Sequence, residues 1–335
     1  MAEAERRISF AKRIRYRGEW IAVRALAIAV PLLPRALANF LADIFGAVAA
    51  YVYRPGRHTA LNNLECAFPE MPLARRRSLV RQSYQHFARA QVDLFWSPRL
   101  TSENVRDIFD LQDLDRLQRE QGDRGFIFAC LHYGGFEWIA VVLGLCGFDC
   151  TVVTQAFKNE LLDETFNSLR EVSGHQTIRR EGALLRLLKA LKRNRSVVFA
   201  VDLTISPRLP SVPIRCFGME TCITIAHSFL QQRSGAPIIP TCCEPLPDGR
   251  YRLVLGAPLE FAREATAQEI AQACWNSLEP LVRQNPAPWL WMYKHWRYRP
   301  ADATQRYPAY ANESPYFEAL RERMRSDETA QPLAH

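Results

Sequence analysis

The sequence predicts an α/β protein with a central, largely buried mixed sheet flanked by helices, preceded by an N-terminal hydrophobic helical segment that anchors it to a membrane. Three observations carry this prediction. Short apolar runs alternate with helical patterns between Gly125 and Leu255, and a long apolar stretch runs from Trp20 to Tyr53. The 335 residues are 48% hydrophobic and 23% charged, which excludes a disordered chain and a polytopic transporter.

The N-terminal apolar stretch is divided by Pro31 and Pro34 and interrupted by Arg24, Asn39 and Asp43. Neither half reaches the roughly 20 uninterrupted apolar residues of a clean spanning helix. A single spanning helix and an amphipathic hairpin in the membrane interface both fit. Basic residues on both sides suit an anionic cytoplasmic leaflet; they are Arg6, Arg7, Lys12, Arg13, Arg15 and Arg17 before the stretch, and Arg54, Arg57 and Arg75 to Arg77 after it.

Periodicity predicts the elements in chain order. Helices are expected over 62–96, 136–145, 160–172, 183–191 and 221–232, and strands over 125–131, 150–154, 196–202, 237–242 and 251–255. The division into domains follows: a basic and hydrophobic membrane anchor over 1–57, a catalytic domain over 58–300, and a polar, peripheral tail over 301–335.

Charge and cysteine usage narrow the setting. The net charge of +8 favours anionic partners, namely nucleic acid, lipid headgroups or an acidic protein. Nine cysteines without a CxxC pair indicate free thiols in a reducing compartment, so the body is expected on the cytoplasmic side. A cleaved signal peptide ending near Ala47 to Ala50 is the alternative, and the cysteines oppose it.

The sharpest motif is His132-Tyr133-Gly134-Gly135-Phe136-Glu137, an H-x4-E arrangement where a buried strand leads into a helix. Open α/β folds place their active sites at such strand ends. Glu137 is expected to fold back beneath the imidazole and orient it as a general base, while Gly134 and Gly135 leave room for a substrate. The alternative is that His132 only caps the following helix.

Other candidates each have a structural alternative. Cys130 shares a strand face with His132 and suits a nucleophile or, preferably, a small core residue. Arg170, Arg179 and Arg180 suit phosphate or carboxylate recognition, or a charged helix face. Asp202 closes an apolar strand as a site residue or as a turn former. The segment Phe217 to Thr221 is expected to be a turn that leads into a helix N-terminus, where an oxyanion or phosphate would bind.

The stretch from Pro286 to Pro300 interleaves three tryptophans with basic residues, which would suit single-stranded nucleic acid or a lipid interface. The histidines form no metal-ligand pattern, and no nucleotide-binding or serine-hydrolase motif occurs. We therefore predict no metal and no cofactor.

Taken in order, these landmarks resemble the late acyltransferases of lipid A biosynthesis, within the lysophospholipid acyltransferase superfamily. Residues 62–70 (NNLECAFPE) resemble the family's N-terminal signature, and HYGGFEW resembles its H-x4-D/E box, with Gly135 and Phe136 in place of the usual Asn and Trp. Arg170 falls at the family's site arginine, and Asp202-Leu203 replaces its Asp-Gln pair. The match is completed by Phe217-Gly218 with Thr221, by Gly235 to Pro237 and by Pro286 to Trp291.

The resemblance implies an acyl carrier protein thioester as donor and a hydroxyl of a lipid A precursor as acceptor. It also implies that the protein is anchored to the cell inner membrane, where anionic lipids are its partners. It implies direct acyl transfer with His132 as base and Glu137 as its orienting acid. Arg170, or amides near Gly134 and Gly135, would stabilise the oxyanion, with Asp202 as a further substrate-binding residue. An apolar pocket would select chain length, at about 0.8 kcal/mol per buried methylene.

Two other functions remain open. The departures at Gly135, Phe136 and Leu203 allow a different acceptor, namely a lysophospholipid, an ornithine lipid or another glycolipid. A membrane-peripheral nucleic-acid binder would use the aromatic and basic stretch instead, although we expect no nucleic acid as a partner.

Overall fold

The computed structural model describes residues 9–120 and 124–330. The start of the expected basic N-terminus, with Arg6 and Arg7, and the last residues of the expected tail lie outside the described residues.

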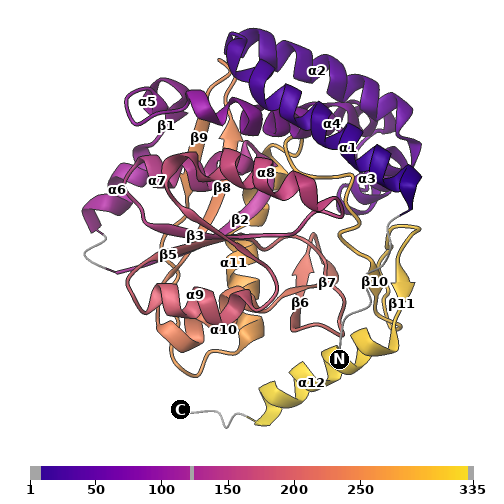
Figure 1. Ribbon diagram of the computed structural model, residues 1–335. Helices are drawn as coiled ribbons and strands as arrows, with labels where there is room; N and C mark the ends of the chain where they lie inside the picture. Colours follow the sequence, from indigo (N-terminus) through magenta and orange to yellow (C-terminus); the bar gives the residue numbers. More distant parts are fainter. Residues whose placement is uncertain (1–8, 121–123, 331–335) are drawn as a thin grey trace.

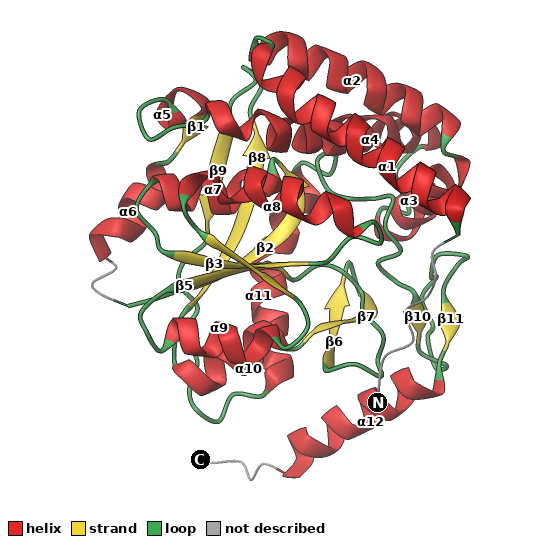
Figure 2. Ribbon diagram, viewed as in Figure 1, coloured by secondary structure: helices red, strands yellow, loops and turns green. Residues whose placement is uncertain are grey.

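A seven-stranded mixed sheet forms the centre of the protein, in the order β1-β9-β8-β2-β5-β3-β4. Its strands are β1 (Phe109–Asp110), β2 (Ile127–Gly134), β3 (Cys150–Thr154), β4 (Gln176–Arg179), β5 (Ser196–Ala200), β8 (Ile238–Pro245) and β9 (Tyr251–Leu255). Only β8 and β9 pair antiparallel; the other neighbours are parallel. Helices cover both faces (Figures 1 and 2), so the predicted mixed α/β architecture is confirmed.

The two faces of β2 belong to different halves of the core. Ile127, Ala129 and Leu131 pack in the cluster with α9 (Ala183–Leu191), α10 (Ala226–Ser234) and α11 (Ala267–Gln284). Phe128 and Cys130 pack on the other side. That side is covered by α6 (Gln112–Glu120), α7 (Ile139–Leu145), α8 (Asp163–Arg170) and the end of α4 (Leu73–Trp96). Since side chains alternate along a strand, the residue at 132 continues the second set.

Four N-terminal helices form a layer beside the sheet (Figure 1). They are α1 (Phe10–Ala29), α2 (Arg35–Val52), α3 (Arg54–Ala67) and α4. As expected, the two prolines separate α1 from α2, with a short 3-10 turn, η1 (Val30–Leu32), between them. The helical pattern over 62–96 is broken by a turn between Ala67 and Leu73, because Phe68 leaves the helical conformation and Pro69 and Pro72 cannot continue it.

Small residues bring α2 against α4. Ala38, Ala42, Gly46 and Ala50, one turn apart, are its buried positions. A Cβ on Gly46 would lie 2.6 Å from the Cα of Gln85, so only glycine permits this approach. Asp43 and Arg89 form an ion pair across the same contact, 2.5 Å between Oδ2 and Nη2. The helix is therefore fixed to the body along one face.

Short elements complete the fold. These are α5 (Val105–Ile108), four further 3-10 turns, η2 (Ser97–Arg99), η3 (Phe136–Trp138), η4 (Glu160–Leu162) and η5 (Glu171–Ser173), a hairpin of β6 (Ser211–Cys216) and β7 (Met219–Thr224), a two-stranded pair of β10 (Tyr298–Arg299) and β11 (Asn312–Glu313), and α12 (Pro315–Ala330).

Local prediction was most accurate where one element fills an apolar run. The strands over 150–154 and 251–255 and the helix over 183–191 have the expected bounds, and 136–145 is helical with a first 3-10 turn. The helix expected over 221–232 is wrong in its first turn, because residues 221–224 belong to β7. Phe217 and Gly218, with φ of 52° and 80°, form the tip of the β6–β7 hairpin and do not lead into a helix N-terminus.

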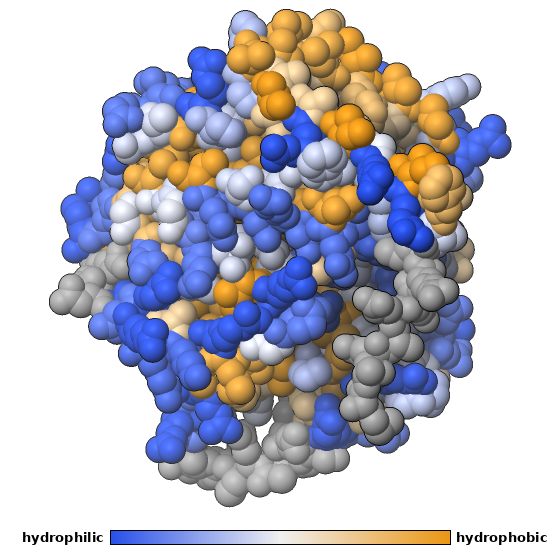
Figure 3. Space-filling view, viewed as in Figure 1, coloured by the Kyte–Doolittle hydropathy of each residue, from blue (hydrophilic) through white to orange (hydrophobic). Residues whose placement is uncertain are grey.

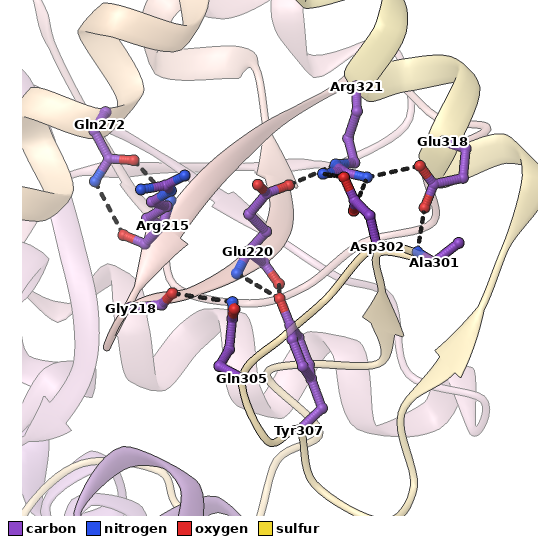
Figure 4. A network of polar contacts seen from close by, with 10 residues as sticks. All are labelled: Arg215, Gly218, Glu220, Gln272, Ala301, Asp302, Gln305, Tyr307, Glu318 and Arg321. Atoms are coloured by element: carbon purple, nitrogen blue, oxygen red, sulfur yellow. Dashed lines mark hydrogen bonds and ion pairs between the residues drawn. The ribbon is translucent and has the colours of Figure 1, made fainter.

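The expected polar tail is docked over much of its length (Figure 4). Arg321 of α12 pairs with Glu220 of β7, with Nε and Oε2 2.6 Å apart, and also bonds Glu318 and Asp302. The Tyr307 hydroxyl accepts a hydrogen bond of 2.7 Å from the backbone N–H of Glu220. Phe317 of α12 is fully buried. A peripheral or partly mobile segment was expected from the polar composition. The ion pairs of Arg321 and the buried Phe317 hold the described part of it against the body.

Candidate active site

His132 and Asp202 lie side by side because their strands are neighbours in register. In the parallel pair of β2 and β5, Cys130 lies opposite Ala200, so the residues two positions further on also meet. The Nδ1 atom of His132 is 2.8 Å from Oδ1 of Asp202, and the backbone N–H of His132 donates to Oδ2 at 3.0 Å. The carboxylate thus fixes both the ring and the main chain of the histidine.

Charge governs the protonation of this pair. Burial alone would lower the pKa of His132, but the carboxylates of Asp202 and, more weakly, Glu137 outweigh it and raise that pKa above its usual value. Burial alone would raise the pKa of Asp202, and the neighbouring imidazole outweighs it, so the carboxyl stays ionised. With Nδ1 donating to Asp202, Nε2 of the neutral ring is left as a proton acceptor.

Trp289 completes the support of the carboxylate. Its Nε1 donates to Oδ2 of Asp202 at 2.9 Å. Trp289, Trp291 and Trp296 are all fully buried. Trp289 stacks on Phe217, Trp291 and Trp296 pack against Phe217 tilted and edge-on, and Trp291 lies edge-on to Trp289. The interpretation of the 286–300 stretch as an exposed aromatic surface for nucleic acid or lipid is therefore wrong, because these rings have no free faces on which bases or lipid could stack.

Glu137 has a different partner from the one expected. It forms a two-pronged ion pair with Arg170, whose Nε and Nη2 atoms are each 3.0 Å from a carboxylate oxygen. Among the described residues, the carboxylate that accepts a hydrogen bond from the His132 ring is that of Asp202. The expectation that Glu137 orients the imidazole is corrected. Glu137 lies on the short η3 helix and its side chain points toward α8. Its effect on His132 is electrostatic: its negative charge helps to raise the pKa of the imidazole.

Gly134 and Gly135 serve packing. The amide of Gly134 donates to the Pro288 carbonyl at 3.1 Å, and that of Gly135 donates to the Cys243 carbonyl at 3.2 Å. Neither amide is available for an oxyanion, which corrects that expectation. Gly134 has a φ of +56°, and a Cβ there would collide with the Cys243 carbonyl oxygen. The space at these glycines is filled by residues of β8 and β9, not by a substrate.

A buried polar cluster supports the turn from behind, and sequence reasoning missed it. The Tyr251 hydroxyl donates to Asp93 at 2.5 Å, and the Arg35 guanidinium lies 5.4 Å from the ring centroids of both Trp138 and Tyr251. Burial raises the pKa of Asp93 to about 6, against the lowering effects of Arg35 and Tyr251. Trp138 directly follows Glu137, so α2, α4 and β9 together fix the end of the motif.

The pocket in front of His132 has a volume of about 1090 Å³, slightly above the usual range of roughly 300–1,000 Å³ for small-molecule sites. His132, Glu137 and Arg170 line it together with apolar side chains, among them Val152, Leu184, Leu187, Val198 and Phe199. Phe136 packs edge-on against the His132 ring at 5.0 Å. The site thus combines an imidazole polarised by Asp202 with a mainly apolar pocket.

Cys130 borders the same pocket as a small core residue. Burial raises the pKa of its thiol well above the usual value, and the Sγ atom donates to the Phe128 carbonyl at 3.6 Å. A thiol that resists ionisation makes a poor nucleophile. The structure thus favours the core interpretation over a Cys-His pair.

A family model described as bacterial lipid A biosynthesis acyltransferase matches residues 7–298, most of the chain. The chain belongs to this family. The lipid A biosynthesis palmitoleoyltransferase of Escherichia coli is 25% identical over 297 residues, covering 88% of this chain and 95% of that protein. The lauroyltransferase of the same organism is also 25% identical, over 302 residues, with the same coverage. A lipid A biosynthesis acyltransferase of Haemophilus influenzae is 23% identical over 294 residues, covering 85% and 92%.

Membership of the lipid A acyltransferase family makes the protein a transferase of acyl groups in lipid A biosynthesis. Of the residues that carried the resemblance, His132, Glu137 and Arg170 line the pocket. Asp202 is buried behind His132 and does not line it, and Gly134 and Gly135 face β8. Strand register is the signal that would have paired His132 with Asp202, and it becomes visible only once β2 and β5 are known to be neighbours.

Proposed function

We propose that this acyltransferase moves a fatty acyl chain from the thioester of acyl carrier protein to a hydroxyl group of a lipid A precursor, with His132 as general base. One observation carries the proposal: the imidazole of His132, held at Nδ1 by Asp202, lines a largely apolar pocket of about 1090 Å³. A hydroxyl acceptor needs such a base, and an acyl chain needs such a chamber.

The reaction is a direct transfer. Nε2 of His132 takes the proton from the acceptor hydroxyl as its oxygen attacks the thioester carbonyl. The tetrahedral intermediate then collapses, the C–S bond breaks, and the imidazolium returns its proton to the leaving sulfur. Asp202 stabilises the imidazolium between the two steps. General-base catalysis of this kind raises the rate by roughly 10²- to 10⁴-fold.

Arg170 is our candidate for oxyanion stabilisation. It lines the pocket, and two of its nitrogens bond Glu137, which holds the guanidinium plane in one orientation. Glu137 is then a positioning residue that acts through the arginine. Its nearby charge also raises the pKa of His132, which adds to the basicity of the ring.

We propose that helices α1 and α2 dock the enzyme on the inner membrane with the body on the cytoplasmic side. By length and composition α2 is the one described helix that could span a bilayer. Its small-residue face packs on α4, however, while large apolar side chains face outward, among them Leu37, Phe40, Leu41, Ile44, Phe45 and Val48. Figure 3 shows apolar side chains gathered over α1 and α2. This pattern favours the interfacial alternative.

The sidedness rests on the thiols. All nine cysteines are free, and seven of them are buried. Free thiols in that number suit a reducing compartment. The cytoplasm is also where acyl carrier protein thioesters would be encountered under the proposed reaction.

The decisive assay incubates the purified full-length enzyme with acyl carrier proteins bearing chains of different length and with a lipid A precursor, and determines the product mass. We expect one added acyl chain, and loss of that product with His132→Ala at unchanged thermal stability. Retained transfer in that variant contradicts the general-base role. Transfer to a lysophospholipid or ornithine lipid, with none to the precursor, would identify the alternative acceptor class.

A further inference from the structure

The cationic side chains at the pocket are only partly accounted for by the proposed chemistry. Three of them line it, namely Lys158, Arg170 and Arg180, and Glu137 is the one carboxylate among the lining residues. Because Glu137 is paired with Arg170, Lys158 and Arg180 remain uncompensated there. Both are exposed, and neither side chain has a bonding partner among the described residues. A fatty acyl chain is uncharged, so it does not explain two cations at the pocket.

The fold places these two side chains at the same edge of the sheet. Lys158 follows β3 and Arg180 follows β4, and these strands pair in parallel with Thr154 opposite Arg179. The amide of Arg180 also donates to the Thr154 carbonyl at 3.0 Å. The carboxyl ends of parallel strands are where open sheets bind ligands, and His132 follows the same rule on β2.

Both loops are held rigidly while the two cations project from them. Arg186 donates to the carbonyls of Arg179 and Glu181, each at 2.7 Å, and so braces the loop on either side of Arg180. Asp163 ties the two loops together, since it accepts from the Phe157 amide at 2.9 Å and from Arg179 at 3.1 Å. A charge on a fixed loop binds an anion with little loss of backbone entropy.

We propose that Lys158 and Arg180 form a phosphate-binding site at the pocket, which holds a substrate's phosphate group while its reacting atoms reach His132. Arginine and lysine are the side chains that best bind phosphate oxygens. The inference rests on the proposed function, and two substrates could supply the group. One source is a phosphate on the lipid A precursor; the other is the phosphodiester of the pantetheine arm that carries the donor thioester.

The test compares Lys158→Ala/Arg180→Ala with a matched control, Lys192→Ala/Arg193→Ala. The control removes one lysine and one arginine, both exposed and outside the pocket, from the loop before β5, at the amino end of that strand. We expect the first variant to raise KM for one substrate roughly tenfold or more, with kcat changed less than threefold and the control unchanged. The variant Lys158→Arg/Arg180→Lys keeps both positive charges, so its KM should stay close to that of the wild type.

Truncated substrates identify the source. If the KM penalty disappears with a dephosphorylated acceptor, the site binds the acceptor phosphate. If it disappears with an acyl N-acetylcysteamine thioester, which lacks the phosphodiester, the site binds the donor arm. A penalty that persists with both truncated substrates, or that the control variant shares, overturns the proposal.

A binding measurement separates this site from the proposed function. In a His132→Ala background, which should not turn over, equilibrium dialysis measures the affinity for the phosphorylated precursor and for acyl carrier protein. The double variant should bind one of them at least fivefold more weakly. If the wild-type chain transfers nothing but this difference holds, the function fails and the site stands; equal affinities for both probes overturn the site.

Discussion

Arg170 donates two hydrogen bonds to Glu137, each 3.0 Å long, so the acid of the H-x4-E box is committed to an arginine from another helix. If Glu137 acts through Arg170, Glu137→Gln and Arg170→Ala should each lower kcat/KM by roughly 10²-fold, the scale of losing an oxyanion donor. The double variant should be no worse than either single one. A double-mutant cycle measures this, with the exposed Arg106→Ala as a neutral control.

Multiplicative losses in that cycle would contradict the assignment. They would mean that Glu137 contributes to His132 independently of the arginine, through the charge that raises the pKa of the imidazole.

Asp202→Asn should separate orientation from charge at His132. The base must be neutral, and Asp202 favours the protonated ring by raising its pKa above the usual 6.5. Removing the charge lowers that pKa, so the acid limb of the log kcat/KM profile should move to lower pH, while the plateau falls by roughly 10²- to 10⁴-fold. An unmoved limb would show that another group titrates; thermal unfolding checks that the variant folds.

Gly134→Ala should destabilise the protein far more than a substitution at an unhindered glycine. At Gly134 a Cβ meets the Cys243 carbonyl, whereas at Gly174, with φ of +80°, nothing lies within 4 Å. We expect Gly174→Ala to cost about 1 kcal/mol from backbone strain alone, and Gly134→Ala more than about 3 kcal/mol. Chemical denaturation in detergent compares the two, and equal losses would disprove the steric argument.

His227 should make the fold sensitive to acid. It is fully buried, neither ring nitrogen has a hydrogen-bond partner among the described residues, and burial lowers its pKa to about 4. The unfolded chain binds a proton near 6.5 and the folded one does not, so stability is lost as pH falls from 6.5 toward 4, by about 2–3 kcal/mol from this residue.

His227→Leu should remove this residue's share of the pH dependence of the free energy of unfolding. His58→Gln, at an exposed position, should leave that pH dependence unchanged. Burial lowers the pKa values of His86 and His175 to about 4 as well, so a reduced slope, and not a flat profile, is expected. Denaturation at pH 7 and pH 5 gives the difference; identical slopes in the variant and the wild type would refute the assignment.

Phe40→Ser/Phe45→Ser should weaken binding to vesicles of phosphatidylethanolamine and phosphatidylglycerol without lowering thermal stability, because both rings face outward from α2. Leu185→Ser, exposed on α9, is the matched control. An interfacial α2 also predicts release of the wild-type protein from membranes by alkaline carbonate. Retention in the pellet would instead support a spanning helix.

The sequence by itself determined the local structure and the chemistry on offer. Apolar runs of strand length, such as Cys150–Thr154 and Tyr251–Leu255, and the proline break between α1 and α2 were readable because each depends on neighbouring residues. His132 and Asp202 were visible for the same reason, since a polar residue at the end of an apolar run stands out locally. Glu137 was visible through its spacing from His132, and Arg170 through the family resemblance.

Only the tertiary structure decided which of these residues act together. Asp202 reaches His132 because β5 lies beside β2, although 70 residues separate them in the chain. Glu137 of η3 pairs with Arg170 because the fold brings the end of α8 to it. The burial of the three tryptophans was misjudged, and the docking of α12 was not foreseen, for the same physical reason. Burial and pairing arise from contacts between distant segments, whose free energy no local pattern records.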